Sequence, residues 1–501
     1  MKMGPWLVAV SAGSLLTAGC GTRLSDDDFL AVQQGIGPTS APDGTAAGSG
    51  AGATPLPGAS ASAGPGGTTG GTTSGGTQPG TTGGTPGGIT GGTQPGGPKA
   101  QNYASDVGVT ATTITVGNIR TQGGVFGPDQ FTPSFYGAAA YFQDLNAQGG
   151  VNGRSVIFRS CDDGGDTSGN QACACQLVEQ DKIFALAANN IFNYGADSYV
   201  SGKGVPDIGG QPIGVSYDTY PHLYSIYGSQ YPRDGKVGYK GKLYGGTEDY
   251  RFYKQKFGLK RAGVVYYDQA QSARFGQGIA KFLRAEGFDP VVEYRVSLAL
   301  ANFDQVVVDM RDKKIEGVWD AMDAAGNANL CQAMNSNNFV PKVKASTIST
   351  WTESVGRQFD PPCRDAIYVI GKSRPYTETG HPEVAKFRTA MRRYFPQRES
   401  KLHQWSLEGW AAAMWLTDAI ASCGAAVTRV CVEKFMNRGK AHPYTARGLL
   451  APRFFEPYDF SKVKTAYECD SAVHWKVDHW ETVGIIDKDC FATPYQSYSP
   501  Q

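Results

Sequence analysis

The chain has 501 residues, including 66 glycines and 10 cysteines, and a formal net charge of +1 at pH 7. Lysine and arginine show neither an excess nor a patch, so nucleic acid is not expected as a partner. No apolar run reaches the roughly 20 residues that a membrane-spanning helix needs.

The first 20 residues predict export and a lipid anchor. Lys2 precedes a short apolar stretch, Trp6–Leu16, and the run LLTAGC ends at Cys20. A secretory signal typically has a basic start, a short apolar segment and small residues at the cleavage site. A cysteine directly after Ala-Gly resembles a bacterial lipobox, in which the thiol receives a diacylglycerol. We therefore expect residues 1–19 to be a signal peptide and Cys20 to be lipidated, which places the protein outside the cytoplasm, anchored to the cell membrane. An ordinary signal peptide with an incidental cysteine is the alternative.

A low-complexity segment follows the cysteine. Between about residues 35 and 98 nearly every residue is Gly, Thr, Ser, Pro or Ala. Such a segment cannot bury enough apolar surface to offset the entropy of ordering it. We expect residues 20–100 to form a disordered tether, and residues 101–501 to form the folded body.

The folded body alternates strand and helix patterns in two series. About 400 residues exceed the usual size of one hydrophobic core. Strands separated by helices of this length indicate right-handed βαβ units with mostly parallel sheets, so two series predict two α/β lobes. The predicted strands are 113–117, 155–159, 183–187, 262–267, 291–295 and 317–319, and the predicted helices are 135–146, 171–180, 278–286 and 303–311.

The cysteines of an exported chain are expected to form disulfides. Sequence proximity suggests four pairs. Cys161 has two candidate partners only two residues apart, which a helix turns to opposite faces, and the sequence does not separate them. The expected pairs are Cys423–Cys431, Cys469–Cys490, Cys331–Cys363, and Cys161 with Cys175 or Cys173.

No pattern in the chain predicts catalysis. It contains no Gly-x-Ser-x-Gly elbow and no His-Glu-x-x-His motif. An acidic cluster comprises Asp162, Asp163 and Asp166. Its sequence does not match the complete EF-hand loop motif, so a solvated loop is favoured over a calcium site. We predict that the protein is not an enzyme, and we expect no cofactor and no metal.

Several segments resemble one family of binding proteins. ITVGN at 114–118, AAAYF at 138–142 and DLNAQGGVNGR at 144–154 resemble the opening of branched-chain amino-acid ABC transporter substrate-binding proteins. These are type I periplasmic binding proteins related to the Leu/Ile/Val-binding protein. Further similar segments follow in the family's order: LVEQDKI at 177–183, GVP at 204–206, GLKRAGVVY at 258–266, FGQG at 275–278 and LEGWAA at 407–412.

The resemblance implies an α/β fold of two Rossmann-like lobes joined by three crossovers. Lobe one would comprise about residues 107–236 and 372–447, and lobe two about residues 237–371 and 448–495. The ligand would lie between the lobes at the carboxyl ends of the strands, where open α/β sheets place ligands on physical grounds as well.

The loops after the strands supply candidate ligand contacts. In relatives, the loop that holds Asn189, Asn190 and Tyr194 grips the ligand's carboxylate together with the next loop. Phe275 matches a position where relatives often carry tyrosine. Asp320, Asp323 and the loop that ends at Glu353 fall at positions where relatives place an aromatic residue and an acid that binds the ligand's ammonium group. The expected ligand-binding residues are Arg120, Phe126, Asn189, Asn190, Tyr194, Gln211, Phe275, Asp320, Asp323 and Glu353.

The expected function is therefore solute capture. The usual hydroxyl-rich carboxylate grip is missing, which argues against leucine, isoleucine or valine as the ligand. We expect a lipoprotein that captures a small polar organic ligand, amino-acid-like or amide-like, and delivers it to an ABC permease in the membrane. The alternative is a ligand-sensing or wall-associated binding module of the same fold without transport.

Overall fold

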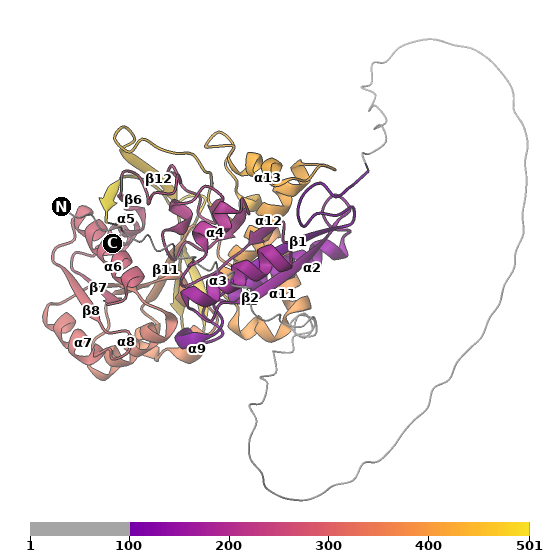
Figure 1. The fold of residues 1–501 in the computed structure, drawn as a ribbon. Helices are drawn as coiled ribbons and strands as arrows, with labels where there is room; N and C mark the ends of the chain where they lie inside the picture. Colours follow the sequence, from indigo (N-terminus) through magenta and orange to yellow (C-terminus); the bar gives the residue numbers. More distant parts are fainter. Residues whose placement is uncertain (1–100, 500–501) are drawn as a thin grey trace, which may run out of the picture. The chain divides into compact units, whose positions relative to one another are not determined.

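The computed structural model describes residues 101–499 (Figure 1). The predicted signal peptide, Cys20 and the tether lie outside these residues. Within them, no helix is long and apolar enough to cross a membrane.

A five-stranded sheet of parallel strands forms the centre of the first lobe, in the order β2-β1-β3-β4-β5. Its strands are β1 (Thr113–Arg120), β2 (Ser155–Asp162), β3 (Ala185–Ala187), β4 (Asp207–Gly210) and β5 (Leu223–Ser225). Because β1 lies inside the sheet and both faces are covered, its last five residues are all buried. The helices of this lobe are α2 (Pro133–Ala147), α3 (Thr167–Cys175), α4 (Asp197–Gly202), α11 (Pro382–Tyr394), α12 (Gln404–Ser422) and α13 (Arg429–Met436).

A seven-stranded sheet forms the centre of the second lobe, in the order β14-β13-β11-β10-β9-β7-β8. The strands from β11 to β8 are parallel, and β13 and β14 add an antiparallel hairpin at one edge. The strands are β7 (Ala262–Tyr267), β8 (Val291–Val296), β9 (Gly317–Ala321), β10 (Val343–Ser346), β11 (Ile367–Gly371), β13 (Ser471–Lys476) and β14 (His479–Gly484). The helices are α5 (Glu248–Phe257), α6 (Ala270–Ala285), α7 (Phe303–Asp312), α8 (Ala324–Ser336), α9 (Val355–Gln358) and α10 (Pro361–Arg364).

Two short antiparallel ribbons complete the strands. The first pairs β12 (Thr465–Cys469) with β15 (Cys490–Pro494), and the second pairs β6 (Leu243–Gly245) with β16 (Gln496–Tyr498).

The first lobe contains helices from a late part of the chain, drawn in orange beside α2 in Figure 1. Helix α12 is almost wholly buried and packs directly on α2. The two helices approach closely at reciprocal glycines. A Cβ at Gly137 would lie 1.7 Å from the carbonyl oxygen of Ser406, and one at Gly409 would lie 2.0 Å from that of Ser134. No side chain fits at either position.

The chain passes between the lobes in three crossovers that lie side by side. Ser229 forms a bridge with Phe455, and Ser373 forms one with Leu450. The predicted fold class is therefore confirmed: two Rossmann-like α/β lobes joined by three crossovers.

Most predicted elements are present, with shifted ends. The strand predicted at 262–267 is β7 with the same bounds, whereas the helix predicted at 278–286 begins eight residues earlier, at Ala270. The helix predicted at 171–180 is split into α3 and a π-helical turn, Gln176–Gln180. The sequence patterns did not predict the hairpin of β13 and β14 or the ribbons.

Four disulfides join eight of the nine described cysteines to one another. The pairs Cys331–Cys363, Cys423–Cys431 and Cys469–Cys490 form as expected. Of the two candidates for Cys161, Cys173 and not Cys175 is the partner. Cys173 is buried and faces β2, and a step of two residues turns Cys175 to another face of α3.

Candidate functional site

A cavity of about 490 Å³ lies between the two lobes. This volume is in the usual range for small-molecule pockets. The first lobe contributes loops that follow β1, β3 and β4, and the second contributes loops that follow β7, β9, β10 and β11. The cavity thus lies at the carboxyl ends of parallel strands of both sheets, as expected for an open α/β architecture.

Aromatic side chains form much of the wall on the first lobe. Phe126 lies 4.4 Å from Phe192 and 5.4 Å from Phe131, measured between ring centroids. Phe131 in turn stacks on Trp405, at the start of α12, with centroids 5.9 Å apart. The wall here is therefore a connected aromatic cluster with few polar atoms.

The second lobe faces this cluster with a mixed wall. Trp319 and Asp320 come from β9, Tyr267 ends β7, and Phe275 lies on α6 with half of its surface exposed at the cavity. Of the predicted ligand-binding residues, Phe126, Phe275, Asp320 and Asp323 line the cavity.

Asp320 is already paired within the second lobe. Its Oδ2 lies 3.4 Å from Nζ of Lys344, and both side chains are fully buried. Its Oδ1 accepts hydrogen bonds from Asn327 Nδ2 at 2.9 Å and from the Met322 amide at 3.2 Å. Burial lowers the pKa of Lys344, while the charge of Asp320 opposes this change. Since a buried pair of this kind balances its own charge, Asp320 is not available to a cationic ligand group.

Asp323 caps helix α8 at the cavity wall. Its Oδ1 accepts hydrogen bonds from the Gly326 amide at 3.2 Å and from the hydroxyl of Tyr267 at 2.7 Å. Both contacts use the same oxygen. Within the described residues Oδ2 therefore stays available to a hydrogen-bond donor of a ligand.

Three of the residues expected to grip a carboxylate instead hold the first lobe together. Asn189 accepts from the Ile119 amide at 2.7 Å and donates to Asp207 at 2.9 Å. The hydroxyl of Tyr194 donates to the same Asp207 oxygen at 2.8 Å. Gln211 donates from Nε2 to Glu408 at 2.7 Å. None of the three lines the cavity.

The remaining expected residues also lie away from the cavity wall. Asn190 is fully buried beneath the sheet end, and its side chain has no hydrogen-bond partner among residues 101–499. The guanidinium of Arg120 lies 4.4 Å above the ring of Phe135. Glu353 lines a separate hollow of about 800 Å³, and burial raises its pKa.

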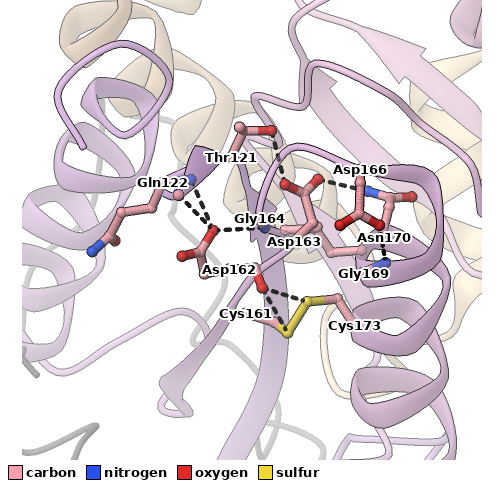
Figure 2. Close-up of a disulfide and its surroundings, with 12 residues drawn as sticks. Thr121, Gln122, Cys161, Asp162, Asp163, Gly164, Asp166, Gly169, Asn170 and Cys173 are labelled. Atoms are coloured by element: carbon pink, nitrogen blue, oxygen red, sulfur yellow. Dashed lines mark hydrogen bonds between the residues drawn. A yellow bond between two sulfur atoms is a disulfide. The ribbon is translucent and has the colours of Figure 1, made fainter. Parts of the chain in front are cut away.

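The acidic loop after β2 supports the loop that carries Phe126. Asp162 Oδ1 accepts hydrogen bonds from the amides of Gln122, Gly123 and Gly164. Figure 2 shows Asp162 between Gln122 and Gly164, beside the disulfide of Cys161. Asp163 and Asp166 are likewise engaged by neighbouring hydroxyl, amide and backbone groups. These carboxylates fix the loop geometry, and Asp163 is buried in it, although the sequence predicted a solvated loop.

Side-chain and backbone hydrogen bonds join the two lobes beside the cavity. Gln271 Nε2 donates to Asn193 Oδ1 at 2.9 Å, and Arg274 Nη2 donates to the Ile213 carbonyl at 3.3 Å. The Ala324 amide donates to Gln130 Oε1 at 3.4 Å. Gln271 Oε1 is buried without a partner in the described part of the chain.

Sequence reasoning missed several wall residues. Gln271 and Arg274 lie in the first turns of α6, and they were overlooked because the helix was expected to begin at residue 278. A helix predicted to begin directly after the strand at 262–267 would have made Gln271 and Arg274 candidates for the cavity wall. Tyr498, which reaches the cavity from β16, carries no sequence signal of this role.

The fold is a two-lobed α/β architecture with a cavity between its two sheets. A family model described as periplasmic binding protein matches residues 113–467. The chain therefore belongs to the periplasmic binding protein family, which comprises extracytoplasmic solute-binding proteins and is not a family of enzymes. A search of curated proteins returns no match.

Solved structures agree with this fold at low sequence identity. A fatty acid ABC transporter substrate-binding protein from Thermomonospora curvata has a TM-score of 0.58 and 14% identity, covering 78% of this chain and 95% of its own. An ABC transporter solute-binding protein from R. palustris, in complex with benzoate, has a TM-score of 0.56 and 14% identity, covering 77% and 97%. A branched-chain amino acid transporter substrate-binding protein from Streptococcus pneumoniae, in complex with isoleucine, has a TM-score of 0.55 and 16% identity, covering 75% and 100%.

Proposed function

We propose that this protein captures a small organic ligand in the interlobe cavity and delivers it to an ABC permease. The observation that carries this proposal is the cavity itself, which both lobes line at the carboxyl ends of their strands. A ligand enclosed in this way contacts both lobes, so binding and lobe closure form one coupled equilibrium. The hinge would then run through the three adjacent crossovers, near the lobe boundaries expected from sequence.

The ligand we propose has a larger apolar part than the sequence suggested. The amides of Asn189, Asn190 and Gln211, expected to contact an amino-acid-like or amide-like ligand, do not line the cavity. Aromatic rings from both lobes do. An aromatic or aliphatic body with a few polar groups suits such a wall. The similar structures include a fatty acid transporter protein and complexes with benzoate and with isoleucine, a range that is consistent with this class.

Asp323 is the acid that we propose for the polar contact on the second lobe. Its Oδ2 is available, whereas Asp320 is paired with Lys344. A donor group of the ligand, such as an amine, fits that position.

Anchoring and delivery remain part of the proposal. Cys20 would carry the lipid, and the segment 20–100 would link it to the binding body. Replacing Cys20 with alanine should abolish labelling by radioactive palmitate and release the protein from membranes. Equal labelling and equal membrane association would contradict the anchor.

The function is tested by identifying what the protein binds and whether cells need the protein to import it. Mass spectrometry of molecules released from the denatured full chain should find one organic compound near equimolar amounts. Uptake of that compound should fall in cells that lack the protein. A bound compound with unchanged uptake would contradict transport and favour the sensing module.

A further inference from the structure

Among residues 101–499, two cationic side chains line the cavity, and one of them is paired with three acids. Lys372 Nζ lies 2.9 Å from Glu248 and 3.0 Å from Asp249, and it also pairs with Asp470. Three acids around one ammonium leave no positive charge for a ligand. The other lining cation is Arg274.

Arg274 faces the cavity without an ion pair to any residue in 101–499. Its hydrogen bond goes to the neutral carbonyl of Ile213, 3.3 Å from Nη2. Asp218, an acid close enough to influence its charge, accepts a hydrogen bond from Ser229, and burial raises the pKa of Asp218 to about 6. Burial also lowers the pKa of Arg274. Asp218 also lines the cavity and is mostly ionised at neutral pH, so it offsets part of the charge of Arg274 without forming an ion pair with it. A negative group of a ligand would offset the rest of the cost of this partly buried cation.

Tyr498 lies beside this cation and comes from strand β16. Its ring packs edge-on against Phe282, with centroids 5.4 Å apart, and the charge of Arg274 acts on its hydroxyl. The pKa of Tyr498 is raised to about 12 by burial, so the hydroxyl is a donor at neutral pH. The strand is held by pairing with β6 and by Lys281, whose Nζ donates to the Ser497 carbonyl.

This wall lies beyond the part of the chain that matches the family model. That match covers residues 113–467, and Tyr498 follows the disulfide-linked ribbon of β12 and β15. The second lobe thus gains a cavity wall from a segment that the matched region does not contain.

We propose that Arg274 and Tyr498 form the anion-binding end of the cavity and hold the carboxylate of a ligand whose body is largely apolar. The guanidinium supplies charge-assisted N–H donors, and the phenol supplies one O–H donor. In the first lobe, the amides of Asn189 and Gln211 are engaged elsewhere, so that lobe does not supply the expected carboxylate grip. This inference rests on the proposed function and adds the chemical class of the ligand.

The test compares matched probes that differ only in charge. The pairs are 3-phenylpropionate with 3-phenylpropionamide and octanoate with octanamide, titrated calorimetrically into the full chain. The wild type should bind at least one carboxylate about tenfold or more tightly than its amide, the effect expected of a charge-assisted hydrogen bond. Arg274→Gln should bring the carboxylate and amide affinities to within about twofold of each other, and loss of the bond to Ile213 should weaken both probes alike. Tyr498→Phe should reduce it severalfold.

Arg295→Gln is the matched control, since Arg295 is exposed and its one side-chain hydrogen bond goes to the Asp268 carbonyl. It should keep the wild-type preference, and melting temperatures verify folding of each variant. A carboxylate preference that survives Arg274→Gln would overturn the proposal, as would binding of none of the four probes to the wild type. A native ligand that carries no carboxylate or other anionic group would also overturn it, while leaving the proposed solute-binding function intact.

Discussion

The Gln271 side chain donates a hydrogen bond to Asn193 at 2.9 Å, and these two residues belong to opposite lobes. The contact joins the lobes beside the cavity, where it would stabilise a closed arrangement around a ligand. The unpartnered Oε1 of the same amide leaves one acceptor for that ligand among the described groups.

Gln271→Ala should therefore weaken ligand binding roughly two- to tenfold, the usual contribution of one hydrogen bond. Titration calorimetry with the native ligand measures the effect. Gln305→Ala is the control, because Gln305 is exposed on α7 and outside the cavity.

Ligand should also lower the radius of gyration of the wild type in solution scattering. A scattering curve unchanged at saturation would argue against coupled closure.

Asp323→Asn separates capping from ligand recognition. Asparagine is as good an N-cap as aspartate and still accepts from Tyr267, so the melting temperature should stay near that of the wild type. Losing the carboxylate charge should weaken binding of an amine-bearing ligand by at least about tenfold. Unchanged affinity in calorimetry would show that Asp323 caps helix α8 and does not bind the ligand.

Stability should depend on pH through Glu408, which is buried on α12. Its carboxylate accepts hydrogen bonds from Gln211 at 2.7 Å, Ser373 at 2.6 Å and Tyr227 at 3.0 Å. Burial nevertheless raises its pKa from 4.5 to about 7. Between these values the folded protein holds a proton that the unfolded chain has released. The free energy of unfolding should therefore fall as pH rises from about 4.5 to about 7, by on the order of 3 kcal/mol for this group.

Glu408→Gln should flatten that decline in urea melts at pH 5 and pH 8. Part of the decline should persist below pH 6, because burial also raises the pKa values of Asp207 and Asp218 to about 6. An identical pH dependence in the variant would show that Glu408 does not titrate in this range.

Gly137→Ala should destabilise the first lobe strongly. The added Cβ would lie 1.7 Å from the Ser406 carbonyl oxygen, so α2 and α12 would have to separate. We expect a loss of about 3 kcal/mol or more, at the upper end for forced overpacking. Gly202→Ala is the control, since a Cβ there meets nothing within 4 Å and should be neutral. Equal stability of the two variants in chemical denaturation would contradict the packing described for α2 and α12.

Sequence predicted the fold better than the site, for physical reasons. Strand 262–267 was visible because a buried parallel strand is a continuous apolar run, and its bounds are those of β7. Asn189 lies after β3 as expected, but its amide is satisfied by Ile119, 70 residues away in sequence. Only tertiary structure shows that such a group is occupied. The wall formed by Tyr498 depends on a strand pairing with β6, which no local pattern encodes.

The central claim, that the interlobe cavity holds the ligand, is tested most directly by filling the cavity. Ala321 lines it at the end of β9, whereas Ala285 is exposed at the end of α6. Mass spectrometry of compounds released from Ala321→Phe should find the native ligand lost or greatly depleted, while Ala285→Phe retains it at the wild-type ratio. Recovery of the same compound at the same ratio from folded Ala321→Phe would contradict the account.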